Sequence, residues 1–197
     1  ELSAMFDPQQ VTAAFRTQEE AVDTESLALA LRKAVADAPG LGSCMHSEIT
    51  ELQREGDKIR GNGHRQKELF SESYDTVVNA LWEQRLFIDA SLGFKPDRPV
   101  MHRFKFGLFT RASEIVRTLP SVTFLIGSFG DTVGFRDNAY VSWYPAGLVS
   151  QECTLKPSVA LVTVDTEKQQ EIITKTVQNL QRLMPERAAC LKDDPAI

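Results

Sequence analysis

The sequence predicts an α+β fold in which antiparallel sheet packs against helices. Two segments, 25–37 and 166–184, carry apolar residues at helical spacing. Between them, short alternating polar and apolar runs are separated by turn residues, which is typical of antiparallel strands. The 197 residues are 42% hydrophobic and 25% charged, which is enough for one large domain or two small lobes.

The first lobe is expected over residues 1–93. A helix is predicted over Glu25–Asp37, capped by Asp23 or Thr24. A three-stranded meander follows, and Gly56-Asp57 supplies its first turn.

Two further segments of this lobe bear on ligand binding. Gly61-Asn62-Gly63 could open a dinucleotide fingerprint, but Gln66 stands where a third glycine is needed, so we interpret it as a hairpin loop. Val77 and Val78 predict a short buried strand that ends in the turn Asn79-Ala80-Leu81-Trp82. Open α/β sheets bind ligands at such strand ends.

The second lobe is expected over residues 94–197, beyond a boundary near Pro96 and Pro99. Its sheet is predicted as four antiparallel strands: Val100–Thr110, Val122–Ser128, Thr132–Phe135 and Ala139–Tyr144. Val122–Ser128 is expected to be buried on both faces. A short helix at 112–118 and a strand at 159–164 are also predicted. The final helix begins at a Thr166 cap and buries a stripe of Ile172, Ile173, Val177, Leu180 and Leu183.

Strand alternation places Arg103 and Lys105 on one face of Val100–Thr110, and Tyr140, Ser142 and Tyr144 on one face of Ala139–Tyr144. A solvated outer face explains this pattern. A clamp for a carboxylate or phosphate explains it too, because an arginine fork matches a carboxylate bidentately. Both interpretations stay open from the sequence.

Composition limits the partners. A net charge of −5 disfavours a general nucleic-acid binder. No apolar run is long enough for a membrane span, and the first residues do not resemble a signal peptide. The scattered Cys44, Cys153 and Cys190 predict reduced, buried thiols in a cytoplasmic protein. No residues stand at metal-ligand spacing, and no catalytic signature is present.

Several segments resemble FAD-dependent oxidoreductases of the D-amino-acid oxidase/glycine oxidase superfamily. They are FRTQEEAVDTESLALALRKAV (Phe15–Val35), the Met45–Arg60 hairpin, YDTVVNALWEQRLFIDASLG (Tyr74–Gly93), PVMHRFKFGLF (Pro99–Phe109) and GDTVGFRDNAYVSWYPAG (Gly130–Gly147). The resemblance implies that residues 1–93 are a remnant of an FAD domain and that 94–197 belong to a substrate domain.

The resemblance also implies site residues. Asn79, Ala80, Leu81 and Trp82 would line the FAD side. Arg103, Lys105, Tyr140 and Tyr144 would form the substrate face over the isoalloxazine. The GxGxxG unit of the family does not occur, and the chain begins with Glu1 rather than Met. We therefore expect a fragment that holds FAD poorly and is inactive alone.

Three hypotheses of function follow. The chain is part of a flavin-dependent oxidoreductase that oxidises a C–N or C–O bond of a small, amino-acid-like substrate. Alternatively, it is a stand-alone module that binds a small anion without redox chemistry. A third possibility is an interaction domain that self-associates through exposed apolar surface.

Overall fold

The computed structural model describes residues 2–111, 120–127, 129–158, 163–189 and 195–196. Within these ranges the chain is an α+β protein with antiparallel sheets, as the sequence predicts. It divides into two compact units. Unit 1 comprises Glu1–Ala28, Arg103–Ser150 and Leu161–Ile197, and unit 2 comprises Leu29–His102 and Gln151–Ala160.

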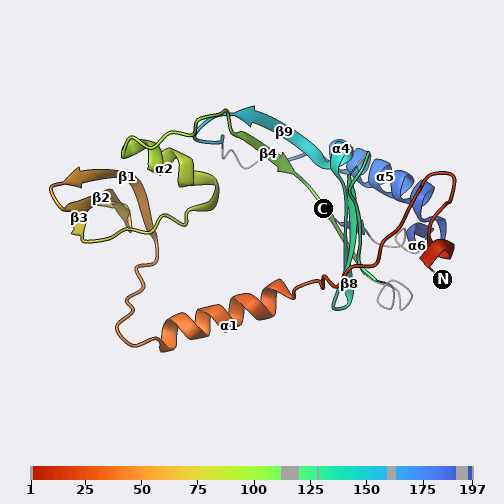
Figure 1. Ribbon diagram of the computed structural model, residues 1–197, viewed down its shortest axis with the longest axis horizontal. Helices are drawn as coiled ribbons and strands as arrows, with labels where there is room; N and C mark the ends of the chain where they lie inside the picture. The colour runs from red at the N-terminus through yellow and green to blue at the C-terminus, as the bar shows by residue number, and fades with distance from the viewer. Residues whose placement is uncertain (1, 112–119, 128, 159–162, 190–194, 197) are drawn as a thin grey trace. The chain divides into compact units, whose positions relative to one another are not determined.

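Three elements, each labelled in Figure 1, have residues in both units. They are helix α1 (Thr24–Asp37) and strands β4 (Met101–Lys105) and β9 (Leu148–Cys153), and the two strands pair as a two-stranded sheet. No helix in the described ranges is both long and apolar enough to span a membrane.

Unit 1 contains a five-stranded sheet in the order β10-β5-β8-β7-β6, with every neighbouring pair antiparallel. Its strands are β5 (Leu108–Arg111), β6 (Val122–Phe124), β7 (Gly130–Phe135), β8 (Asn138–Trp143) and β10 (Pro195–Ala196). A 3-10 helix, η1 (Leu2–Met5), and a single helical turn, α4 (Tyr144–Gly147), belong to the same unit.

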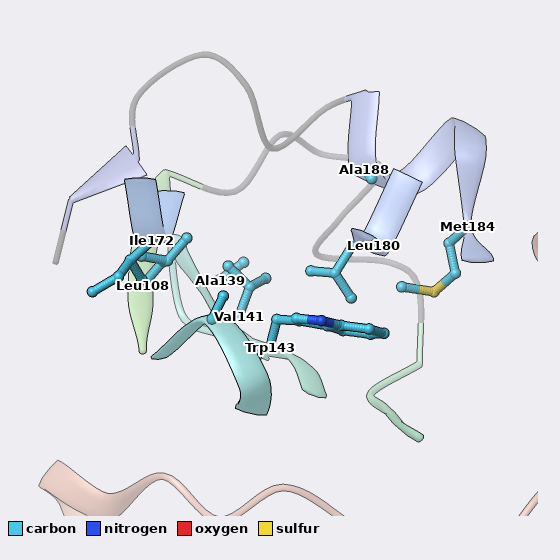
Figure 2. Close-up of a cluster of buried hydrophobic side chains, with 9 residues drawn as sticks. Leu108, Ala139, Val141, Trp143, Ile172, Leu180, Met184 and Ala188 are labelled. Atoms are coloured by element: carbon cyan, nitrogen blue, oxygen red, sulfur yellow. The ribbon is translucent and has the colours of Figure 1, made fainter. Parts of the chain in front are cut away.

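The core of unit 1 lies between one face of this sheet and helix α5 (Thr166–Leu183), which is followed by α6 (Pro185–Ala189). Figure 2 shows Leu180 and Met184 pointing toward the indole of Trp143. The predicted helix and its apolar stripe are confirmed: Ile172, Val177 and Leu180 are buried, and Ile173 and Leu183 are half-buried. The cap is Asp165 rather than Thr166, because the Asp165 side chain accepts from Lys168 N at 2.8 Å.

The predicted strand Val100–Thr110 was wrong as a single element, because the chain changes partners at Phe106-Gly107. β4 pairs with β9, and β5 pairs with β8. Between them, Phe106 N donates to Gly147 O at 2.9 Å. Gly107 lies so close to the Tyr140 ring that a Cβ there would overlap it.

The prediction of a doubly buried Val122–Ser128 was also wrong. β6 ends at Phe124, and Gly127, with φ +95°, turns the chain toward β7. Ile126 at the tip of this turn is 98% exposed. The helix predicted at 112–118, and the predicted strand at 159–164 in its greater part, lie outside the described residues.

Unit 2 contains the predicted meander of β1 (Ser47–Glu55), β2 (Lys58–Arg65) and β3 (Glu68–Tyr74), with Gly56-Asp57 as its first turn. The interpretation of Gly61-Asn62-Gly63 as a hairpin loop was wrong, since these residues lie inside β2. A Cβ at position 63 would overlap the carbonyl oxygen of Glu48 on β1. The second glycine therefore serves close strand packing.

Val77 and Val78 do not form the predicted buried strand. No described strand pairs with them, and Val78 is 85% exposed. They lead instead into η2 (Trp82–Gln84) and α2 (Arg85–Ser91). Helix α2 is joined to the meander because Leu52 N donates to Ser91 Oγ at 2.9 Å.

Helix α1 is confirmed at the predicted position, with Asp23 as its cap. None of its residues is buried, and its large apolar side chains, Leu27, Leu29, Leu31 and Val35, are exposed. Cys44 and Cys153 are exposed too, contrary to the prediction, because one lies in the connection after α1 and the other at the end of β9. Cys190 lies outside the described residues.

Candidate functional site

The sheet of unit 1 has a second face, opposite α5, where polar and aromatic side chains gather. Strand alternation turns Ala139, Val141 and Trp143 of β8 into the core, so Tyr140 and Ser142 project to the other side. The same alternation places Phe109 of β5 there, and its ring packs against Tyr140 with centroids 5.4 Å apart.

Arg103 and Lys105 converge on the ring of Tyr144, which directly follows β8. The guanidinium carbon of Arg103 lies 5.7 Å from the ring centroid, and the Lys105 ammonium lies 5.0 Å from it. Both distances fall within the range of cation–π attraction. Arg103 Nη1 also donates to Tyr144 Oη at 3.4 Å. Two cations and one phenol thus form a single cluster.

The backbone holds Tyr144 in this place. Its N–H donates to Phe129 O at 2.7 Å, and the two rings meet edge to face with centroids 6.4 Å apart. Tyr144 begins the helical turn α4, and Pro145 stands at the start of that turn, where proline is well tolerated. The Tyr144 ring beneath the two cations is therefore held in place by a main-chain hydrogen bond and by its contact with the Phe129 ring.

A carboxylate and a hydroxyl complete the cluster. Ser142 is 1% exposed. Its Oγ donates to Asp131 Oδ2 at 2.9 Å and accepts from Lys105 Nζ at 3.4 Å. Lys105 Nζ and Asp131 Oδ2 are 4.0 Å apart. Ser142 therefore bridges the two members of a long ion pair.

Three of the four residues predicted to bind substrate, Arg103, Lys105 and Tyr144, are brought together. Tyr140 lies on the same face but packs against Phe109 and over Gly107. It would flank a ligand held by the other three rather than share their charge cluster.

Asp131 was missed by the sequence reasoning, which placed it in a turn. The register of β7 and β8 sets its position: the hairpin turn is the two residues Arg136-Asp137, so Asp131 stands opposite Ser142. The sequence prediction included Asn138 in that turn, and a turn longer by one residue would have placed Asp131 opposite Trp143, on the core face. Recognition of Arg136-Asp137 as a two-residue hairpin turn would have located Asp131 opposite Ser142.

The residues predicted for the FAD side lie in unit 2 and serve a local structural purpose. Asn79 Nδ2 donates to Arg85 O at 3.0 Å and to Asp89 Oδ1 at 2.8 Å, and its Oδ1 accepts from Leu81 N at 3.2 Å. Asn79 therefore ties together the start of η2 and α2. Ala80, Leu81 and Trp82 are exposed.

The starts of the two long helices do not fit the pyrophosphate of FAD. A helix N-terminus attracts a phosphate through free N–H groups. At α1 and α5 the cap residues are carboxylates, Asp23 and Asp165, and each accepts a backbone N–H itself. Hydrogen bonds from the Ser26 N–H and hydroxyl, together with the Arg136 guanidinium, lower the pKa of Asp23 to about 2, so this cap is negatively charged at neutral pH. A pyrophosphate would meet a carboxylate at either helix, and at α1 the nearby Arg136 is already paired with Asp23.

Unit 2 carries an open hollow lined by His46, Ser47, Glu48, His64 and Lys67 at one end of the meander. Among the residues that the structure describes, no group of three or more histidine, cysteine, aspartate or glutamate side chains could hold a metal ion. The cluster around Tyr144 is taken as the candidate ligand site because it brings two cations to one aromatic ring.

Comparison with protein-family models finds no match, and comparison with curated protein sequences finds none either.

Proposed function

We propose that unit 1 binds a small carboxylate ligand on the open face of its sheet, through Arg103, Lys105 and Tyr144. We further propose that this ligand is the amino-acid-like substrate of a flavin-dependent oxidoreductase of which this chain is a part. The convergence of two cations on one aromatic ring is the observation that carries the first proposal.

That convergence favours a binding site over a solvated outer face. Solvated lysines extend into water, since fixing a long side chain costs entropy and surface ion pairs return little. The Lys105 side chain is only 30% exposed, and it lies over Tyr144 with its ammonium at Ser142. A cation held in this way is preorganised for an anion.

Each residue has a distinct role. The guanidinium of Arg103 presents its donors as a planar fork, which suits the two oxygens of a carboxylate. The Lys105 ammonium adds a second charge, and Tyr144 supplies a hydroxyl and a ring beneath both. The Phe109–Tyr140 pair offers an apolar surface for the remainder of a small ligand.

The redox part of the proposal rests on the resemblance of the quoted segments to D-amino-acid oxidase relatives. In such enzymes FAD, when bound, accepts the hydride, and the protein supplies position and electrostatics. Because α1 and α5 begin with anionic caps, we expect the FAD pyrophosphate to be held by other residues. We therefore assign no step of the redox chemistry to residues of this chain.

Thermal unfolding in sodium propanoate, compared with sodium chloride at equal ionic strength, tests the carboxylate site. At ten times Kd we expect stabilisation of about 1.4 kcal/mol. Arg103→Ala should weaken binding by about tenfold or more, because it removes a charged hydrogen-bond donor. Arg182→Ala is the matched control, since Arg182 is exposed near the end of α5, the helix that covers the opposite face. Equal propanoate binding by wild type and Arg103→Ala would refute the site.

A binding module without redox chemistry is the second candidate, and the acidic caps of α1 and α5 favour it. The two candidates separate when the chain is mixed with FAD, a 2-amino or 2-hydroxy acid and a dye that accepts electrons. Reduction of the dye supports the oxidoreductase. Carboxylate binding without dye reduction, at FAD concentrations that saturate any flavin binding, supports the module.

A further inference from the structure

Resting on the proposed carboxylate site, we infer that Ser142 is a positioning residue that keeps Lys105 available to an anion, and that Asp131 competes with the ligand for this lysine. The site thus carries its own counter-ion. The competition weakens the binding of any carboxylate, whatever the rest of the ligand is.

Ser142 lies at the centre of this contact. It projects from the open face of the sheet, yet it is only 1% exposed, so neighbouring side chains cover it. A buried hydroxyl needs hydrogen-bond partners, and it can both donate and accept. Ser142 Oγ donates to Asp131 Oδ2 at 2.9 Å and accepts from Lys105 Nζ at 3.4 Å. The backbone fixes its place, because Ser142 stands opposite Asp131 in the register of β7 and β8.

The hydroxyl holds the two charged groups apart. Lys105 Nζ and Asp131 Oδ2 form an ion pair at 4.0 Å, which is longer than the roughly 2.7–3.2 Å of a direct hydrogen bond. Loss of the hydroxyl would leave Asp131 Oδ2 without its donor from Ser142. The Lys105 ammonium could then take that place by moving about 1 Å. Their side chains are 30% and 29% exposed, so water screens the attraction only in part.

The present position of Lys105 serves the proposed ligand. Its ammonium lies 5.0 Å from the centroid of the Tyr144 ring, which the guanidinium of Arg103 also contacts. A lysine drawn to Asp131 would leave Arg103 to bind the ligand carboxylate without its help, and the attraction for the ligand would be weaker. Ser142 therefore favours anion binding, and Asp131 opposes it.

Calorimetric titration with propanoate tests the inference, because propanoate carries a carboxylate and no other charged group. We expect Ser142→Ala to weaken propanoate binding about fivefold, since Lys105 then pairs directly with Asp131. Asp131→Asn should bind propanoate about threefold more tightly than wild type. The asparagine carbonyl can still accept from Ser142, so this variant keeps the bridge and loses the competing charge.

The double variant Ser142→Ala/Asp131→Asn separates positioning from packing. Once the charge at position 131 is gone, no carboxylate there captures Lys105. We therefore expect loss of the hydroxyl to change propanoate affinity less than about twofold in the Asp131→Asn background. A loss caused by disturbed packing alone would persist in that background at about fivefold.

Ser121→Ala and Glu167→Gln are the matched controls. Ser121 is exposed directly before β6, and Glu167 is exposed in the first turn of α5, the helix that covers the opposite face of the sheet. One control removes a hydroxyl and the other an acidic charge, as the test variants do. Neither should change propanoate affinity.

The outcomes separate the two proposals. If wild-type chain does not bind propanoate, the carboxylate site fails and the role of Ser142 falls with it. If wild type and Ser142→Ala bind equally, or if the loss persists in the Asp131→Asn background, the positioning role is overturned while the carboxylate site stands. Should Ser142→Ala not fold, Asp131→Asn alone decides: tighter binding supports a competing carboxylate, and equal or weaker binding overturns it.

Discussion

Replacement of Leu180 by alanine tests whether α5 holds unit 1 together. Leu180 is fully buried and points toward the indole of Trp143 (Figure 2). Burying a leucine side chain contributes about 1.5–3 kcal/mol, and the cavity left by truncation adds to the loss. We expect Leu180→Ala to lower the free energy of unfolding by about 3 kcal/mol.

The two tryptophans make this loss measurable by fluorescence. Trp143 is buried in the core of unit 1, whereas Trp82 is exposed in unit 2. In a Trp82→Phe background, the emission of Trp143 reports on unit 1 alone. With a urea m-value of about 2 kcal/mol/M, the unfolding midpoint of Leu180→Ala should fall by about 1.5 M.

Ile126→Ala is the matched control, because Ile126 is an aliphatic residue of unit 1 that is 98% exposed. Its unfolding midpoint should move by less than about 0.25 M, since surface substitutions away from packed features cost within about 0.5 kcal/mol. If Leu180→Ala and Ile126→Ala unfold at the same urea concentration, the packing of α5 on the sheet is refuted.

Three further changes test other parts of the chain. Gly147→Ala should destabilise unit 1 by about 2–3 kcal/mol in urea unfolding, because the added Cβ would overlap the Phe106 carbonyl oxygen. Asp165→Ala should cost about 1 kcal/mol and lower the helical circular dichroism of α5 near its melting temperature, because it removes the cap. Hydrogen bonds from Lys168 and then from a second lysine of the same helix lower the pKa of Glu171 from 4.5 to about 2. The stabilisation from this charged carboxyl is present above pH 4.5 and is lost as the pH falls toward 2, so wild-type chain should lose more stability over that range than Glu171→Gln.

Each of these changes has its own control. Gly42→Ala adds a Cβ with no atom within 4 Å, so it should leave stability nearly unchanged. Asp165→Asn keeps a side-chain acceptor and should retain most of the cap. Equal destabilisation by alanine and asparagine at position 165 would contradict the capping role. Parallel pH profiles of wild type and Glu171→Gln would contradict the lysine contacts.

Local periodicity predicted the two long helices, the meander of unit 2 and strands β7 and β8 correctly. α1 and α5 repeat their apolar residues at helical spacing, and the meander of unit 2 alternates between turn residues. These signals depend on neighbours within a few residues along the chain. For the same reason they were insufficient at Val77-Val78, where apolar residues have no described strand partner.

The candidate site was predictable only in part. Alternation along a strand is a local property, so Arg103, Lys105 and Tyr144 could be proposed from sequence. Asp131 could not be joined to them, because its place beside Ser142 depends on the register of two strands. Asn79 shows the converse: a polar residue in a suggestive turn proved to bind the backbone and carboxylate of the following helix.

The sequence by itself determined the two long helices, the meander and the faces on which side chains alternate, because these follow from backbone geometry and spacing. Only the tertiary structure decided where the long strand divides, which strands pair, and which charges meet on the open face of unit 1. Those outcomes depend on contacts between residues far apart in the chain, such as Phe106 with Gly147 and Lys105 with Ser142. No local pattern encodes such contacts.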